Sequence, residues 1–242
     1  LNLAFNLISS FFMFDSHFEV FLADTEESKN IHYNIRYQVY CEEMGFESQD
    51  DFTDEMEFDE NDRHSVHFLV MSKVTGDCVG ALRLIYKDNT VLPIEKSCKL
   101  NEDIIDNKRN NSVELSRLCL IKDVRKGLVD IDPPHGISLR SFQVKEARKV
   151  NRLIIWGLIY AAAEYCAANN VKNWYFMTTS ALSNLLRRGG LKLINIGEPC
   201  QHKGERFPFK MNGIEAYKSD IWKGNFNNGY RLFSELKECK VA

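Results

Sequence analysis

The sequence lacks several features that define whole classes of protein. Its 31 basic and 34 acidic residues give a net charge of only -3, so no overall field draws the chain to nucleic acid or to anionic lipid. None of the seven cysteines forms a C-x-x-C pair or clusters with histidine. This argues against a structural zinc site and for reduced thiols in a cytoplasmic protein. Internal repeats and low-complexity tracts are also absent.

Long apolar runs are scarce, and one apolar stretch stands within residues 1–16. The stretch LNLAFNLISSFFMF has no basic n-region and no clear small-residue cleavage site, and it is too short to span a bilayer. We expect it to dock as a helix or strand onto the domain that follows. The alternative is a peripheral contact with a membrane surface, because its four phenylalanines would be costly to leave in water.

The remaining chain has the composition of a globular protein, with 44% hydrophobic residues among its 242. Its periodic segments follow the order β-α-β-β-β-α-β-α-β-β. This order predicts an α/β (α+β) fold with a mixed central sheet and helices on both faces. We expect one domain over residues 17–222 and a C-terminal extension over residues 223–242.

Short apolar or alternating runs mark the expected strands, which cover residues 17–23, 65–73, 77–87, 112–121, 171–179, 191–197 and 213–220. The expected helices cover residues 26–43, 142–169 and 180–188. Thr25 suits the N-cap of the first helix, and the pair Gly189-Gly190 suits the end of the third. A Pro- and Gly-containing loop before the long helix is a candidate wall of a site.

An acidic segment stands out between Glu42 and Asp62, where eleven carboxylates occur without a single lysine or arginine. Most of them suit an ordinary solvated loop. The segment begins in RYQVYCEEMGF (36–46), continues with E-x-D-x-x-D (57–62), and is followed by ALRL (81–84) and VELSR (113–117). In this order and spacing the motifs resemble the signature of the acyl-homoserine-lactone (autoinducer) synthases.

The resemblance is stronger still to two groups of relatives, the PEP-CTERM/exosortase-associated acyltransferases and the long-chain N-acyl amino acid synthases. All belong to the GNAT superfamily, so the resemblance implies a GNAT-like N-acyltransferase fold over roughly residues 18–220. It also implies a cluster that binds the amine substrate, formed by Arg36, Tyr40, Phe46, Glu57, Asp59, Asp62 and Arg83. Lactone synthases typically have tryptophan where this chain has Phe46, which departs from their S-adenosylmethionine site.

The mechanism that the resemblance implies is direct attack of a neutral amine on a thioester, without a protein nucleophile, a metal or a tightly bound cofactor. We expect Glu114 to accept the ammonium proton, with Ser116 and Arg117 beside it on the same strand. The alternative for Glu114 and Arg117 is a structural ion pair. Strand alternation places these two side chains on opposite faces unless a bulge intervenes.

The acyl donor is expected to be acyl carrier protein, with coenzyme A as the alternative. The loop VRKGLVDIDPPHG does not match the Q/R-x-x-G-x-G/A motif with which many GNAT enzymes hold the pyrophosphate of coenzyme A. The residues expected to bind the donor are Leu118, Cys119, Leu120, Arg125, Lys126, Arg148, Lys149 and Arg152. If the basic start of the long helix does not bind the donor, it is a solvated surface. The apolar half of the same helix is either part of the core or an acyl channel.

The sequence supports two further hypotheses, about charge and about chemistry. Arg36 and Arg83 would hold the acidic segment against the sheet, leaving net negative charge for a cationic amine. Cys119 is expected to be a buried, inert thiol, and His64 and His67 to point to opposite faces.

We predict an N-acyltransferase acting on an amino acid or similar small amine. The rivals are a lactone-forming autoinducer synthase and a non-catalytic module that binds acyl carrier protein or lipid.

Overall fold

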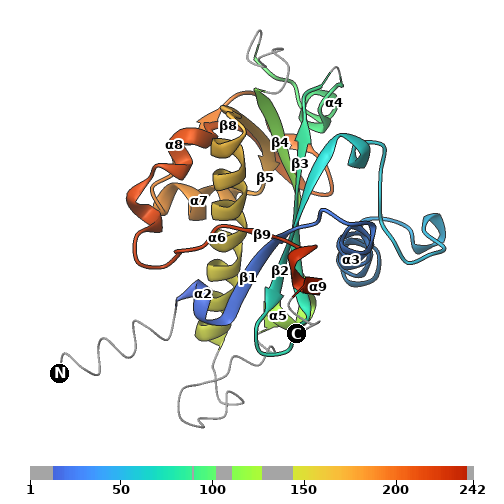
Figure 1. The fold of residues 1–242 in the computed structure, drawn as a ribbon. Helices are drawn as coiled ribbons and strands as arrows, with labels where there is room; N and C mark the ends of the chain where they lie inside the picture. Colours follow the sequence, from blue (N-terminus) through green and yellow to red (C-terminus); the bar gives the residue numbers. More distant parts are fainter. Residues whose placement is uncertain (1–12, 89, 102–110, 127–143, 239–242) are drawn as a thin grey trace.

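The computed structural model describes residues 13–88, 90–101, 111–126 and 144–238, which form a mixed sheet flanked by helices (Figure 1). The strand order is β6-β8-β5-β4-β3-β2-β1-β9, and β7 pairs with β8. The β4–β5 and β1–β9 pairs are parallel, and the other neighbours run antiparallel. The expected fold class is confirmed. The strands are β1 (Phe18–Leu22), β2 (Ser65–Ser72), β3 (Cys78–Tyr86), β4 (Ser112–Leu120), β5 (Asn173–Thr178), β6 (Ile194–Asn195), β7 (Cys200–Gln201), β8 (Glu205–Asn212) and β9 (Arg231–Leu232).

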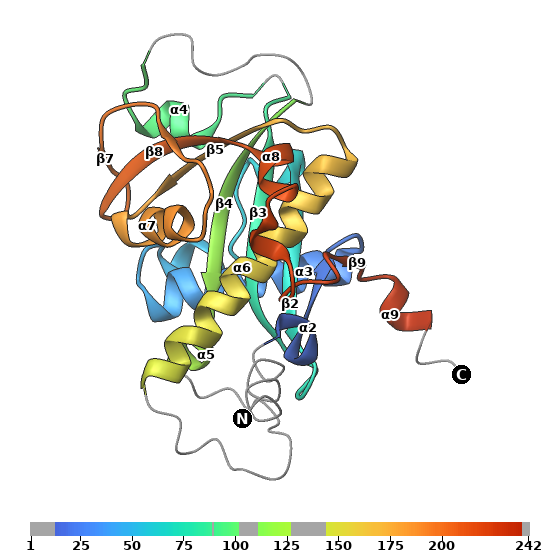
Figure 2. The same cartoon turned by 90° about the vertical axis from the view of Figure 1, so that its left-hand side faces the viewer.

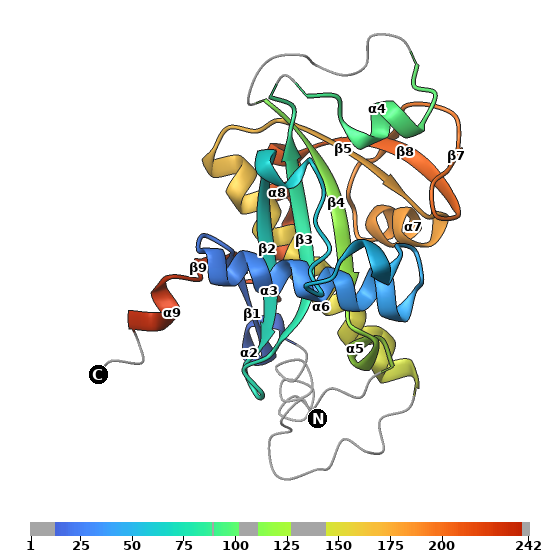
Figure 3. The same cartoon turned by 90° about the vertical axis from the view of Figure 1, so that its right-hand side faces the viewer.

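Helices cover both faces of this sheet. The long helix α6 crosses one face together with α8 (Figure 2), and α3 crosses the other (Figure 3). The helices are α2 (Phe14–His17), α3 (Glu26–Tyr37), α4 (Pro93–Ser97), α5 (Lys122–Lys126), α6 (Val144–Ala168), α7 (Ser180–Arg188), α8 (Gly213–Tyr217) and α9 (Glu235–Glu238). None of those in the described part of the chain combines the length and apolar character that crossing a bilayer requires.

Helix α3 begins where the sequence predicts. The Thr25 hydroxyl accepts a hydrogen bond from the Ser28 backbone N–H at 3.1 Å, and the Ser28 hydroxyl accepts one from the Thr25 N–H at 3.0 Å. This reciprocal cap satisfies two backbone donors that the first turn would otherwise leave unpaired. The helix continues as a π-helical turn over Gln38–Glu43, so the chain stays helical over the expected residues 26–43.

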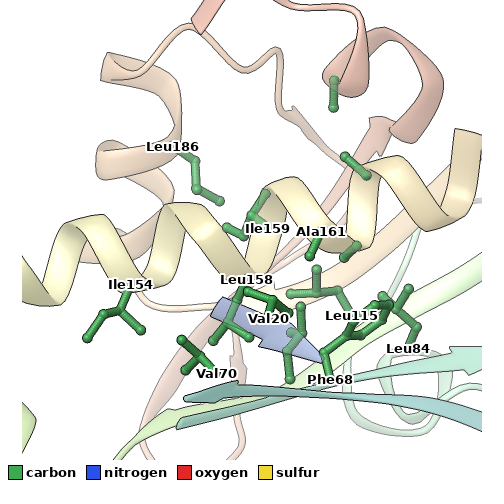
Figure 4. Close-up of a cluster of buried hydrophobic side chains, with 14 of the residues drawn as sticks. Val20, Phe68, Val70, Leu84, Leu115, Ile154, Leu158, Ile159, Ala161 and Leu186 are labelled. Carbon is green, nitrogen blue, oxygen red and sulfur yellow. The ribbon is translucent and has the colours of Figure 1, made fainter. Parts of the chain in front are cut away.

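The main core lies between the sheet and α6. Phe68 and Val70 of β2 point to the α6 side, where they join Ile154 and Leu158 (Figure 4). Leu69, between them in the sequence, belongs to the second core, on the α3 side, as strand alternation requires. Each fully buried side chain of this size contributes about 1.5–3 kcal/mol through the apolar area that it removes from water.

The last residues of the apolar N-terminal segment dock onto this core. Phe14 of α2 is 1% exposed, and its ring lies 2.3 Å from where a Cβ on Gly157 of α6 would stand. Only glycine therefore lets the ring approach the helix this closely. Residues 1–12, the rest of the segment, lie outside the described residues. The expected membrane contact falls on them and stays a prediction.

Two expected strands differ from the structure. The strand predicted near residues 213–220 is wrong, because that stretch begins with helix α8 and the strand before it, β8, ends at Asn212. The Asn212 side chain accepts hydrogen bonds from the backbone N–H groups of Ile214 and Glu215, which caps α8. The strand expected over residues 191–197 is reduced to the two residues of β6.

The cysteines also differ from expectation. Cys98 and Cys200 are joined by a disulfide that links the end of α4 to β7, so the expectation of reduced thiols is wrong for this pair. Cys41, Cys78, Cys119 and Cys166 are free. Sequence spacing could not reveal the pair, because the two cysteines stand 102 residues apart and meet only through the folding of the sheet.

Residues beyond 222 pack against both cores. Phe226 lies 5.5 Å from Phe14 between ring centroids, and β9 pairs in parallel with β1 at Phe21 and Leu22. Phe233, which follows β9, is buried against Phe21. The C-terminal residues up to this point thus contribute to the core and cover one edge of the sheet.

Candidate active site

A large pocket opens where β4 and β5 separate. The two strands are paired only from Ser112 to Glu114 on β4, whereas β5 continues with β8 as its single ladder partner up to Thr178. The pocket has a volume of about 1340 Å³ and takes in both of the diverging strands. Its walls also come from the acidic segment, α6, α7 and the β7–β8 hairpin.

A bulge in β4 shapes the polar wall of this pocket. Ala81 faces Cys119 and Arg83 faces Ser116, so Arg117 and Leu118 together oppose a single residue of β3. Arg117 has a φ of +50°, a conformation that non-glycine residues rarely adopt. Strict alternation would send Ser116 and Arg117 to opposite faces. Because of the bulge, both side chains line the pocket: Arg117 reaches Glu57 of the acidic segment, and the Ser116 hydroxyl accepts a hydrogen bond from Arg83 Nε at 3.0 Å.

Three arginines hold the acidic segment against the sheet. The fully buried guanidinium of Arg36 binds the carboxylates of both Glu57 and Asp62. Arg83 reaches across from β3 and donates to both oxygens of Asp59, at 2.7 and 3.0 Å. Arg117 donates to Glu57 at 2.8 Å. The sequence expectation named Arg36 and Arg83 as anchors, and the structure adds Arg117 as the third.

The electrostatics of this network favour ionised carboxylates. Burial opposes ionisation, yet the charges of Arg36 and Arg117 lower the pKa of Glu57. Burial likewise opposes ionisation of Asp59, whose pKa is lowered by the hydrogen bond from Arg83. The pKa of Asp62 falls well below its usual range because His67 and Arg36 bind it, again against the effect of burial. All three stay charged at neutral pH.

The network is balanced in charge rather than net negative as expected. Its three arginines bind Glu57, Asp59 and Asp62, and Glu47, which lies 3.6 Å from Arg117, is paired with Lys203. The fourth carboxyl group that the sequence suggested, Glu114, is not a member. Glu114 makes no ion pair with Arg117, so the alternative of a structural pair between them is wrong. Arg117 forms an ion pair with Glu57 instead, and Glu114 accepts a hydrogen bond from the backbone of α4.

Glu114 is a buried carboxyl group in the pocket wall. It is 1% exposed, and one of its oxygens accepts a hydrogen bond from the Ile94 backbone N–H at 2.9 Å. Burial raises its pKa to about 8, against the smaller opposing effects of Ile94 and Arg83. A carboxyl group with such a pKa can hold or release a proton near neutral pH, which is the property a general acid or base requires.

The aromatic and sulfur groups of the pocket surround the bulge. The ring of Tyr40 stacks on Phe46 with 6.4 Å between centroids, and the Arg117 guanidinium lies 5.3 Å from the Tyr40 ring. Burial raises the pKa of the Cys119 thiol to about 12. Cys119 is buried as expected, and its thiol is protonated at neutral pH. Its inertness in the reaction stays a prediction.

The residues expected to bind the acyl donor fall into two groups. Five of them line the pocket, namely Leu118, Cys119, Leu120, Arg125 and Arg152. The other three, Lys126, Arg148 and Lys149, lie on α5 and at the start of α6, outside the pocket wall. An apolar wall follows from α6, β5 and α7, with Ile155, Trp156, Phe176, Leu182 and Leu186.

Several residues of the site were missed by sequence reasoning. Glu47 contacts both Arg117 and Lys203, and His67 lies with its Nε2 2.9 Å from Asp62 Oδ1. His202, Lys203 and Arg206 enter the pocket wall from the β7–β8 hairpin. The sequence offers only a weak signal for this hairpin, a glycine at 204 between two short polar runs. Within the described ranges, no group of three His, Cys, Asp or Glu side chains is arranged to hold a metal ion.

The comparisons with known proteins agree with this architecture. Residues 35–131 match the model of the acetyltransferase (GNAT) domain family. A search of curated proteins gave no match. The domain match covers less than half of the chain, and it agrees with the mixed sheet and flanking helices of the expected GNAT-like fold.

Several solved structures have a similar fold. TofI, in a ternary complex with an inhibitor and MTA, has a TM-score of 0.61 at 17% identity over 84% of this chain and 98% of its own. The AHL synthase LasI has a TM-score of 0.56 at 18% identity over 89% and 98% of the two chains. BjaI, a CoA-dependent acyl-homoserine lactone synthase with SAM and isopentyl-CoA, has a TM-score of 0.61 at 12% identity over 93% and 99%. This chain thus shares the fold of acyl-homoserine-lactone synthases.

Proposed function

We propose that this protein is an N-acyltransferase that moves a fatty acyl group from a thioester to the amine of an amino acid or similar small molecule. The observation that carries the proposal is the pocket between β4 and β5. It combines one buried carboxyl group of raised pKa, Glu114, with an ion-pair network on one wall and apolar side chains of α6 and α7 on another. A small polar acceptor and a long apolar acyl chain need these two kinds of wall.

The reaction needs no protein nucleophile. The amine nitrogen attacks the thioester carbon, the C–N bond forms, the C–S bond breaks, and the thiolate leaves and takes up a proton. The ammonium form of the acceptor must first lose a proton, which Glu114 would accept directly or through water. Backbone amides near Leu118 to Leu120, on the part of β4 that has no β5 partner, would stabilise the oxyanion.

The donor would be acyl carrier protein or coenzyme A. Exposed Arg148 and Arg152 at the start of α6 suit the acidic surface of a carrier protein. The loop that follows β4 does not contain the usual pyrophosphate-binding motif, which favours the carrier protein. BjaI, by contrast, is described as CoA-dependent.

A second candidate is a lactone-forming autoinducer synthase that uses S-adenosylmethionine. It is supported by the fold shared with TofI, LasI and BjaI. Phe46, in place of the tryptophan typical of those enzymes, supports the open amide instead. The products separate the two candidates, because a lactone forms only from that particular amine donor.

Mass spectrometry of lipid extracts tests the proposal. Cells that overexpress the wild-type chain should accumulate an acylated amine that is absent with Glu114→Gln. Glu205→Gln, at an exposed glutamate of the hairpin, is the matched control and should leave the product unchanged. If neither the wild-type chain nor its purified form with acyl thioesters yields an acylated amine, the proposed function is wrong.

A further inference from the structure

The Cys98–Cys200 disulfide joins two segments that both contribute residues to the pocket wall. Cys98 directly follows α4, and Cys200 begins β7. The two segments lie side by side in Figures 2 and 3. Cys98 is buried in a third, small core together with Ile94 and Tyr175, and Cys200 packs against this core. The covalent bond therefore restrains α4 and the β7–β8 hairpin relative to each other.

One helical turn connects this disulfide to Glu114. The Cys98 backbone N–H donates a hydrogen bond to the Ile94 oxygen at 3.0 Å, and the Ile94 N–H donates one to Glu114 Oε2 at 2.9 Å. Helix α4 has only five residues, which is too short for a helix to be stable by itself. The hydrogen bond that Glu114 accepts thus comes from a helix whose position depends on the contacts around it.

Noncovalent contacts join the same two segments. After α4, the Asn101 N–H donates to the Ile196 oxygen at 2.9 Å, and the Glu198 N–H donates to the Lys99 oxygen at 3.0 Å. The side chains of Lys99 and Glu198 also form an ion pair, but both are exposed, so this pair adds little to the stability. Among the described links between α4 and the hairpin, the disulfide is the covalent one.

The other end of the disulfide leads to the ion-pair network. Three residues after Cys200, Lys203 forms an ion pair with Glu47 of the acidic segment. Glu47 lies 3.6 Å from Arg117, at the bulge of β4. The disulfide therefore connects two parts of the pocket wall, the carboxyl group of raised pKa and the charged network, through short chains of contacts.

The pair is placed for thiol–disulfide exchange. Cys200 is partly exposed, whereas Cys98 is 7% exposed, so a thiolate reaches the sulfur of Cys200 more readily. When a dithiol reductant attacks Cys200 Sγ, the S–S bond breaks, and Cys98 leaves as a thiolate that takes up a proton. The second thiol of the reductant then attacks the mixed disulfide and releases Cys200. The protein gains two electrons and two protons, and the reductant becomes a disulfide.

We propose that Cys98 and Cys200 form a redox-modification site that controls acyl transfer. The disulfide form holds α4 where the Ile94 N–H fixes the carboxyl group of Glu114, and the dithiol form releases α4. This proposal rests on the proposed function. A displacement of about 1 Å at a reacting group can cost on the order of 100-fold in rate. Reduction should therefore lower kcat by about 10- to 100-fold and leave the KM of the donor largely unchanged.

The test compares the purified full-length chain before and after treatment with dithiothreitol, the probe reductant. Maleimide labelling in denaturant followed by mass spectrometry should show two additional thiols after reduction. The value of kcat should fall as stated and recover after oxidation with diamide. Hydrogen–deuterium exchange supplies a readout without turnover: peptides that contain Ile94 should exchange faster in the reduced form, while peptides of β2 should not change.

Three variants make the result specific. The double variant Cys98→Ser/Cys200→Ser should behave like the reduced wild type, with or without dithiothreitol. Cys78→Ser removes a free cysteine outside the pocket wall and should keep the full loss of kcat on reduction. Lys99→Met removes the exposed ion pair with Glu198, which joins the same two segments, and should leave kcat and the exchange of α4 unchanged. Circular dichroism checks that each form is folded at the assay temperature.

Three outcomes would overturn the proposal. The first is an equal kcat for the oxidised and reduced forms. The second is a folded protein that releases no thiols in excess dithiothreitol. The third is unfolding of the whole chain on reduction, which would make the disulfide a purely structural bond. Failure of the proposed function looks different: no acylated product forms in either state, while exchange of the Ile94 peptide still depends on the state of the pair. That pattern would support redox control of α4 by itself.

Discussion

Arg36 and Asp62 form a buried, two-pronged ion pair, with Nη1 2.6 Å from Oδ1 and Nη2 3.1 Å from Oδ2. The remaining nitrogen of the guanidinium, Nε, donates a hydrogen bond to Glu57. One arginine of α3 therefore fixes two separate points of the acidic segment. The segment depends on this side chain for its position over the sheet.

Replacing Arg36 with methionine should destabilise the protein by about 3–5 kcal/mol, because two buried carboxylates lose their counter-charge. Urea unfolding at neutral pH measures the loss. Lys29→Met is the matched control on the same helix. It removes an exposed pair with Glu26 and should cost no more than about 1 kcal/mol. A loss below 1 kcal/mol for Arg36→Met would show that the network does not support the fold.

Asp59 and Asp62 should respond differently to replacement by asparagine. Asp59 lines the pocket with its side chain 27% exposed, whereas Asp62 is buried between Arg36 and His67. Asp59→Asn should raise the KM of the amine by about tenfold with little change in donor binding. Asp62→Asn should mainly lower the free energy of unfolding. Steady-state kinetics and urea unfolding on both variants separate these two roles. An equal effect of Asp59→Asn on the KM values of both substrates would contradict the proposed role of Asp59 in amine binding.

Stability should fall as the pH rises through the titration of Glu114. Its pKa is raised from 4.5 to about 8 in the folded state, so the folded protein binds the proton more tightly than the unfolded chain does. The resulting stabilisation is present below pH 4.5 and is lost between pH 4.5 and 8, by on the order of 4 kcal/mol. Glu114→Gln should remove this loss, so its melting temperature should exceed that of the wild type most clearly at pH 8–9. Parallel pH profiles for the two proteins would contradict this assignment.

Charge reversal at the start of α6 tests the carrier-protein donor. With acyl carrier protein as the donor, Arg148→Glu and Arg152→Glu should raise the donor KM at 50 mM NaCl, and the wild-type KM should rise towards theirs at 300 mM. Lys192→Glu, at an exposed position outside the pocket wall, is the control and should behave like the wild type. A wild-type KM that does not depend on salt would argue against docking by these residues.

The parts of this structure that depend on local chemistry were predictable from the sequence. Thr25 caps α3 through contacts only three residues away, and two β-rich apolar runs locate β2 and β3. The strand predicted near 213–220 failed because the cap formed by Asn212 outweighs the local strand propensity. Such a competition between two local preferences is not visible in an apolar pattern.

The candidate site was predictable to the extent that it follows the family signature. That signature identified the three carboxylates that the arginines bind, while most of the other eight are exposed or half-exposed. It did not reveal that Glu114 would stand apart from the network, which depends on the position of α4. It also missed Arg206 and His202, because the hairpin meets the bulge of β4 only in three dimensions.

The short strands at both ends of the sheet affect how molecules of this protein meet one another. An unpaired edge is a template on which a second chain can add a strand. Here β9 covers Phe21 and Leu22 of β1, while β6 and β7 each pair with part of β8. Pro208 of β8 also lacks a backbone N–H that an incoming strand would need. At these two ends of the sheet, the described part of the chain therefore offers short segments for edge-to-edge association, which disfavours fibrous aggregation.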